Sequence, residues 1–174
     1  MSLTDKLQNL AGNSVDELEL IYREYGTAPG FLNDVTRLAQ NDSVEGNATW
    51  LLKKHLESGN KPDEEETSSV WKLLPMLANW EARLHLLQCF SLLRMSVREK
   101  SLIESFLREN LGSRNKFVRA WSYSGFYLFA NEFPEFRGEA RQLIDTALHS
   151  ESASVKARIR NVTKKGFLAD KVGK

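Results

Sequence analysis

The chain has 174 residues, enough for one domain or one compact repeat array with a sizeable core. Hydrophobic residues make up 41% and charged residues 27%, which is ordinary for a globular protein. The net charge is only +1, but residues 1–87 carry 8 Lys/Arg against 14 Asp/Glu, whereas residues 88–174 carry 16 against 9. Such asymmetry can steer an anionic partner to the C-terminal half, and long surface helices also segregate charge without any ligand.

A membrane span and a signal peptide are not expected from the sequence. No run of about 18 apolar residues occurs, and the first residues, MSLTDKLQNLAG, lack a basic segment followed by an apolar one. We therefore expect a cytoplasmic protein with no membrane partner. The single cysteine, Cys89, cannot form an internal disulfide, and its neighbours Leu86, Phe90 and Leu93 predict a core position rather than a reactive thiol.

The first 30 residues predict extra helices, over residues 3–10 and 15–25, that cover the open N-terminal end of the fold. The sequence GTAPG at 26–30 predicts a turn. The longest later break, residues 57–67, contains Gly, Pro and four consecutive acids, and predicts a solvated loop that runs into the positive start of the next helix. The tail after Gly166 is expected to fray.

Four segments align without internal gaps and begin at Asn41, Asn79, Asn115 and Ser152, which are 38, 36 and 37 residues apart. Each opens with a residue that can cap a helix, and apolar residues then recur at the spacing of one helical face. The four apolar stripes are Val44, Ala48, Leu51, Leu52 and His55; Ala82, Leu86, Cys89, Phe90 and Leu93; Val118, Ser122, Gly125, Phe126 and Phe129; and Val155, Ile159, Val162, Thr163 and Gly166.

Another stretch with helical periodicity precedes each segment, whereas strand signals are nearly absent. We therefore predict one all-α domain over residues 1–174, with four helix pairs. Their ranges are 31–57, 66–94, 97–130 and 135–168. An irregular helical bundle is the alternative.

This arrangement resembles the HEAT and armadillo class of α-solenoids, in particular small proteins of four HEAT-like repeats. The resemblance covers residues 31–168. It depends on Val118-Arg119 and Val155-Lys156 early in the second helix of a pair, on Pro75 inside a first helix, and on the capping residue three positions before each valine position. It implies a right-handed α–α superhelix and no particular activity. The sequence departs from the pattern at Glu45, which stands where Arg83 stands in the next segment.

No motif for catalysis, nucleotide binding or metal binding is found. G-x-S-x-G, H-E-x-x-H, G-x-x-x-x-G-K-[ST] and G-x-G-x-x-G are missing from the sequence. The histidines His55, His85 and His149 fall in different repeats at unrelated phases, and one cysteine cannot supply a zinc site. We predict no cofactor, no metal and no identifiable catalytic residue, while a hidden lyase or glycosidase activity stays an alternative.

The resemblance implies that the second helices line a concave groove. The outward positions on these helices give the predicted partner-binding residues, which are Trp50, Lys53, Arg83, Arg119, Tyr123, Tyr127, Lys156, Arg160 and Lys164. Basic residues interleaved with tyrosine can hold carboxylates or phosphates. This pattern predicts a non-catalytic scaffold that binds a protein or peptide, with an acidic partner expected. An ordinary hydrated helix face would show the same pattern.

Nucleic-acid binding by the basic C-terminal half is the alternative function. Some HEAT-like proteins act on DNA, including alkylpurine DNA glycosylases, and the chain resembles them in its helix pairs. No groove-facing Asp lies among the aromatic residues of the last three repeats, so the match to their catalytic region is missing. We interpret Trp80 and Trp121 as residues that fill the ridges between repeats rather than as plates on which bases stack.

Overall fold

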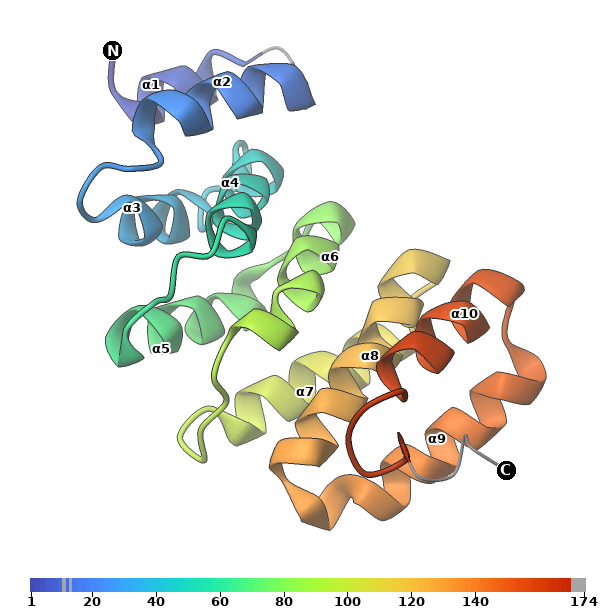
Figure 1. The fold of residues 1–174 in the computed structure, drawn as a ribbon. Helices are drawn as coiled ribbons and strands as arrows, with labels where there is room; N and C mark the ends of the chain where they lie inside the picture. Colours follow the sequence, from blue (N-terminus) through green and yellow to red (C-terminus); the bar gives the residue numbers. More distant parts are fainter. Residues whose placement is uncertain (11, 13, 170–174) are drawn as a thin grey trace. The chain divides into compact units, whose positions relative to one another are not determined.

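The computed structural model describes residues 1–10, 12 and 14–169, and every regular element in this part of the chain is a helix (Figure 1). The all-α prediction is therefore confirmed. The α-helices are α1 (Leu3–Gln8), α2 (Val15–Tyr25), α3 (Phe31–Leu38), α4 (Glu45–Glu57), α5 (Glu64–Leu73), α6 (Trp80–Gln88), α7 (Lys100–Leu111), α8 (Lys116–Glu132), α9 (Arg137–Ser150) and α10 (Ala153–Val162). Short 3₁₀ helices are η1 (Leu74–Met76), η2 (Phe90–Leu92) and η3 (Pro134–Phe136).

Side-chain caps start two of the four aligned helices as predicted. The Asn79 side chain accepts a hydrogen bond from the N–H of Glu81 at 2.8 Å, and the Asn115 side chain accepts one from the N–H of Phe117 at 2.9 Å. Ser152 precedes α10 without making a capping hydrogen bond. Asn41 instead accepts the N–H of Ser43 at 3.0 Å in a separate turn, so α4 begins later, at Glu45.

Helix α5 begins earlier and ends earlier than predicted. Asp63 caps it in a reciprocal pair with Glu66, so the acidic run forms the first helical turn, where carboxylates complement the helix dipole. The helix ends at Leu73, and Pro75 lies in η1. Proline has no N–H to donate and clashes with the preceding turn, which explains why the predicted single helix is broken here.

The chain divides into two compact units, Met1–Arg94 (the N-terminal unit) and Met95–Lys174 (the C-terminal unit). In the N-terminal unit α3 packs against α4 and α5, while α4 packs against α2 and α6. In the C-terminal unit α8 packs against α7, α9 and α10, and α9 also contacts α10. The second helices of successive predicted pairs thus touch within each unit. No helix in the described residues is both long and apolar enough to cross a bilayer.

The predicted apolar stripes form the core, with three exceptions. His55 and Val162 are half-buried, Gly166 is exposed, and all other members are buried. Gly166 lies beyond the end of α10 in a left-handed turn with φ of 86°, where an added Cβ would approach Asn131 to 2.4 Å. The stripe fails there because the helix has already ended at Val162.

Candidate interaction surfaces

Two of the predicted groove residues, Arg83 and Arg119, donate hydrogen bonds to the turns that precede their own helices. Arg83 Nε donates a hydrogen bond to the carbonyl oxygen of Leu77 at 2.9 Å, and Arg119 Nη1 donates one to that of Ser113 at 3.0 Å. In both cases the acceptor lies six residues earlier. The two arginines therefore have the same structural role at equivalent positions of the alignment.

Arg119 also pairs with Glu151, the residue before Ser152. The guanidinium is bidentate, with Nε to Oε1 at 2.9 Å and Nη2 to Oε2 at 3.1 Å. This hydrogen bonding holds the pKa of Glu151 below its usual value. Beside them, burial raises the pKa of the half-buried Tyr123, and the Glu151 carboxylate raises it further. The charge of Arg119 is thus matched within the unit, which leaves little of it for a partner.

Tyr127 does not lie on an open surface, so its predicted place in the groove is wrong. It is 1% exposed. Its hydroxyl donates to the carbonyl oxygen of Lys165 at 2.6 Å and accepts the N–H of Leu168 at 3.0 Å, while its ring stacks on Phe167 at a centroid distance of 4.9 Å. The chain after α10 turns back and covers this part of α8 (Figure 1).

The same contacts correct the expectation of a frayed tail. Asn131 Oδ1 accepts the N–H of Phe167 at 3.0 Å, and Leu168 is buried in the core of the C-terminal unit. The apolar pair at 167–168 within a polar tail is the sequence signal that could have indicated this packing. Residues 170–174 lie outside the described residues.

Trp50 and Lys53 lie on α4, and both are half-buried within the N-terminal unit. Lys53 Nζ is 3.6 Å from Glu57 Oε1 on the same helix, and its side chain is 20% exposed. The charge of Lys53 also acts on His85, which lies on α6. Burial lowers the pKa of His85 to about 4, and the Lys53 charge contributes to the lowering. The His85 ring nitrogen Nδ1 lies 3.0 Å from Thr49 Oγ1.

Lys156, Arg160 and Lys164 are the predicted residues that remain available. The stretch Ser152–Ala169 contains five basic residues and no Asp or Glu. We call these five residues the α10 basic surface: Lys156, Arg158, Arg160, Lys164 and Lys165. Within the described part of the chain, none of the five makes an ion pair.

Members of the α10 basic surface differ in exposure. Arg160, Lys164 and Lys165 are exposed, and Lys156 is half-buried. The Arg158 guanidinium lies over the Trp121 ring, 4.2 Å from its centroid. The indole face of Trp121 is therefore occupied by a cation of the same chain, in keeping with a packing role for this tryptophan.

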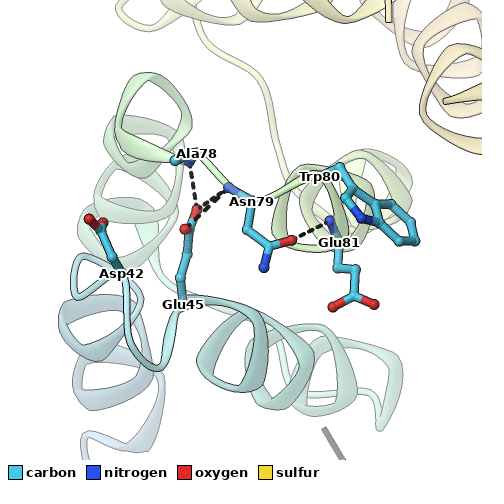
Figure 2. Close-up of a pocket in the computed structure, with 6 residues that line it drawn as sticks. All are labelled: Asp42, Glu45, Ala78, Asn79, Trp80 and Glu81. Carbon is cyan, nitrogen blue, oxygen red and sulfur yellow. Dashed lines mark hydrogen bonds between the residues drawn. The ribbon is translucent and has the colours of Figure 1, made fainter. Parts of the chain in front are cut away.

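Trp80 is exposed, so the interpretation of this residue as one that fills a ridge between repeats is wrong. It is 47% exposed and lines a pocket of the N-terminal unit with Asp42, Glu45, Ala78, Asn79 and Glu81 (Figure 2). Glu45 is 3% exposed, and its carboxylate accepts the backbone N–H groups of Ala78 at 2.8 Å and of Asn79 at 3.3 Å. The position of Trp80, two residues before the stripe begins at Ala82, is the signal that could have indicated its exposure.

The nine predicted residues are divided between the two units. Trp50, Lys53 and Arg83 belong to the N-terminal unit, and the other six belong to the C-terminal unit. Within the C-terminal unit, Arg119 with Tyr123 meets Glu151, Tyr127 meets the tail, and only the residues of α10 and the turn after it stay open. Sequence periodicity could place these residues on helix faces, but it could not show which faces are covered.

The described residues contain no group of three or more His, Cys, Asp or Glu side chains placed to hold a metal ion. Cys89 is fully buried, and burial raises the pKa of its thiol, which confirms its predicted core position. Comparisons with protein-family models, with curated proteins and with solved structures give no match for this chain. We therefore infer a function from the chemistry of the surface.

Proposed function

We propose that this chain is a non-catalytic binding module, built from HEAT-like helix pairs, that binds an acidic protein or peptide through the α10 basic surface. The observation that carries the proposal is the Ser152–Ala169 stretch, with five basic residues, no acidic residue and no internal ion pair among the described residues. Cations that make no ion pair within the described residues can gain one from an acidic segment, and their field raises the rate of encounter with it.

The aromatic residues near this surface favour a protein partner over single-stranded nucleic acid. Binding of unpaired bases uses exposed aromatic rings as stacking platforms. Trp121 is covered by Arg158, and Tyr127 is buried under the tail. The α10 basic surface thus offers charge and hydrogen-bond donors, which suit carboxylates, and these two rings are not available to stack on bases.

Binding of a nucleic-acid duplex is the second candidate, because duplex binding needs only contacts to phosphates. The absence of Asp and Glu between residues 152 and 169 favours any polyanion. Binding to a duplex depends strongly on salt: the logarithm of the affinity falls linearly with the logarithm of the salt concentration, and the slope grows with the number of phosphates contacted.

The test measures the fluorescence anisotropy of a labelled glutamate-rich peptide and of a labelled DNA duplex with the full chain. We expect the peptide to bind, and the variant Arg160→Glu with Lys164→Glu to weaken its binding by about tenfold or more. The matched control is Lys61→Glu with Lys72→Glu, which changes the net charge equally at two exposed positions of the N-terminal unit.

Peptide binding that is lost equally in the control and the test variant would contradict a specific role for α10. Binding of the duplex but not of the peptide would favour the nucleic-acid candidate. A chain that binds neither probe at low salt would contradict both.

A further inference from the structure

The two units carry opposite charges. The N-terminal unit, Met1–Arg94, has 9 Lys/Arg against 14 Asp/Glu, a balance of −5. The C-terminal unit, Met95–Lys174, has 15 against 9, a balance of +6. The two folded bodies thus carry net charges of opposite sign, so each copy presents one acidic and one basic body to other molecules.

The acidic unit has an exposed aromatic residue at a pocket that carboxylate side chains also line. We call Asp42, Trp80 and Glu81 the Trp80 surface. Figure 2 shows Trp80 and Glu81 extending from the first turn of α6, with Asp42 on the far side of Glu45. Trp80 is 47% exposed and Asp42 is exposed, while Glu45 adds a buried negative charge between them. Glu81 is half-buried, and all of these side chains line the same pocket. Indole rings and carboxylates both favour binding of a guanidinium or ammonium group.

The C-terminal unit already shows both kinds of contact that such a surface would make with a basic side chain. Arg158 lies over Trp121 at 4.2 Å from the ring centroid. Arg108 is bidentate with Glu139, at 2.5 Å and 2.9 Å. Arginine and tryptophan are also the residues that most often dominate the binding energy of protein interfaces. Arg160 and Lys164 are exposed and have no such partner among the described residues.

We propose that the α10 basic surface of one copy of this chain docks on the Trp80 surface of a second copy. The inference rests on the proposed function, since it names the acidic partner of the α10 basic surface. Charge complementarity between the two units selects a second copy as the occupant. Because the two surfaces differ, the contact is heterologous, and it joins copies head to tail into rings or open chains.

The first measurement is the molar mass of the full chain by sedimentation equilibrium over a range of protein concentrations. At low salt the average mass rises with concentration above the monomer mass of 19.9 kDa. At about 1 M salt, where the Debye length falls to about 3 Å, it returns to the monomer mass. A wild-type chain that stays monomeric at low salt over the whole range overturns the proposal.

Neutralising variants then locate the contact. The donor variant is Arg160→Gln with Lys164→Gln, and the acceptor variant is Asp42→Asn with Glu81→Gln. Each alone is expected to stay monomeric. Their equimolar mixture is expected to give a dimer and nothing larger, because only the intact α10 basic surface of one and the intact Trp80 surface of the other can meet. Neutral replacements are used because reversed charges could pair with each other in the mixture. A mixture that stays monomeric overturns the proposal.

Two further variants separate the Trp80 surface from general charge and from misfolding. Trp80→Ala keeps the charge and removes an exposed side chain, and it is expected to weaken association at least severalfold. The matched control Glu64→Gln with Glu65→Gln removes two exposed carboxylates elsewhere in the same unit and is expected to leave association nearly unchanged. Association lost as fully in this control as in the acceptor variant contradicts the assigned surface.

The peptide assay distinguishes failure of this inference from failure of the proposed function. If the wild-type chain is monomeric but binds the glutamate-rich peptide through Arg160 and Lys164, the self-association is overturned and the function stands. If the donor variant associates as the wild type does and also binds the peptide as the wild type does, both are overturned.

Discussion

Arg119 joins three pieces of the C-terminal unit: helix α8, the turn before it and the residue before α10. Its guanidinium donates to the carbonyl oxygens of Ser113 and Arg114 and binds both carboxylate oxygens of Glu151. Lysine carries the same charge but cannot bind two oxygens with a planar fork while donating to two carbonyls. The position therefore requires the shape of arginine as well as its charge.

We expect Arg119→Lys to lower the free energy of unfolding by about 1 kcal/mol, since both partners of the Glu151 pair still reach solvent and net hydrogen-bond energies are modest. Urea unfolding measures the change. The double variant with Glu151→Gln should cost less than the sum of the two single variants. Strict additivity would contradict the bidentate pair.

The lowered pKa of His85 is expected to make the stability of the protein depend on pH. Burial, aided by the charge of Lys53, lowers its pKa to about 4, whereas an unfolded chain has a histidine pKa of about 6.5. At a pH between these two pKa values, the unfolded chain binds a proton at His85 and the folded chain does not. The free energy of unfolding therefore falls as the pH falls from about 6.5, by about 3 kcal/mol near pH 4, and the contribution is constant above pH 6.5.

The measurement compares urea unfolding of the wild type and His85→Gln at neutral and acidic pH. Burial also lowers the pKa of His55, which remains in both chains, so the difference between them isolates His85. The glutamine can keep a hydrogen bond to Thr49. Two chains whose stabilities fall in parallel with pH would contradict the assignment.

Helix α8 is the central element of the C-terminal unit. It packs against α7, α9 and α10, and the tail covers its C-terminal half. Tyr127 and Asn131 lie one helical turn apart and bind the main chain of residues 165–168, which forms a turn around Gly166. The tail is thus held as a part of the core and closes the face that the periodicity had left open.

Tyr127→Phe should release this tail while leaving the helices in place. The variant loses the acceptor for the N–H of Leu168 and the donor to Lys165, so we expect faster hydrogen exchange at Leu168 and a cost of about 1 kcal/mol. Amides of α4, in the other unit, serve as the internal control. Unchanged exchange at Leu168 would show that the hydroxyl does not hold the tail.

At the scale of the whole molecule, the two compact units predict separable stability. Each has its own buried side chains: Leu51 lies in the N-terminal unit and Ile159 in the C-terminal unit, both 0% exposed. In a single domain, a local loss of packing destabilises both units. In a chain of two separate units, it destabilises mainly the unit that carries the substitution.

We expect Ile159→Ala to cost about 2–5 kcal/mol and to increase hydrogen exchange in the C-terminal unit more than in the N-terminal unit. Leu51→Ala is the matched variant and should give the reverse pattern. Equal loss of protection in both units, from either substitution, would show one cooperative domain.

Helices and the uneven distribution of charge could be predicted without a structure, because both depend on the local order of residues. Apolar residues at helical spacing identify a buried face wherever a helix packs, so the stripes that begin at Ala82 and Val118 are buried along their whole length. Asn79 and Asn115 start their helices by bonding N–H groups only two or three residues away. The Asn41 turn and Pro75 show the limit, since each changes a helix end without changing the periodic pattern.

Which outward side chains stay exposed could not be predicted in the same way, because it depends on how the helices and the tail pack. Arg119 and Tyr127 satisfy the pattern of an exposed basic or aromatic residue, but their partners lie 32 to 41 residues further along the chain. Trp80 shows the opposite case, a large apolar side chain that no later segment of its own unit covers. Exposure depends on contacts between segments distant in sequence, and the period of one helix contains no information about them.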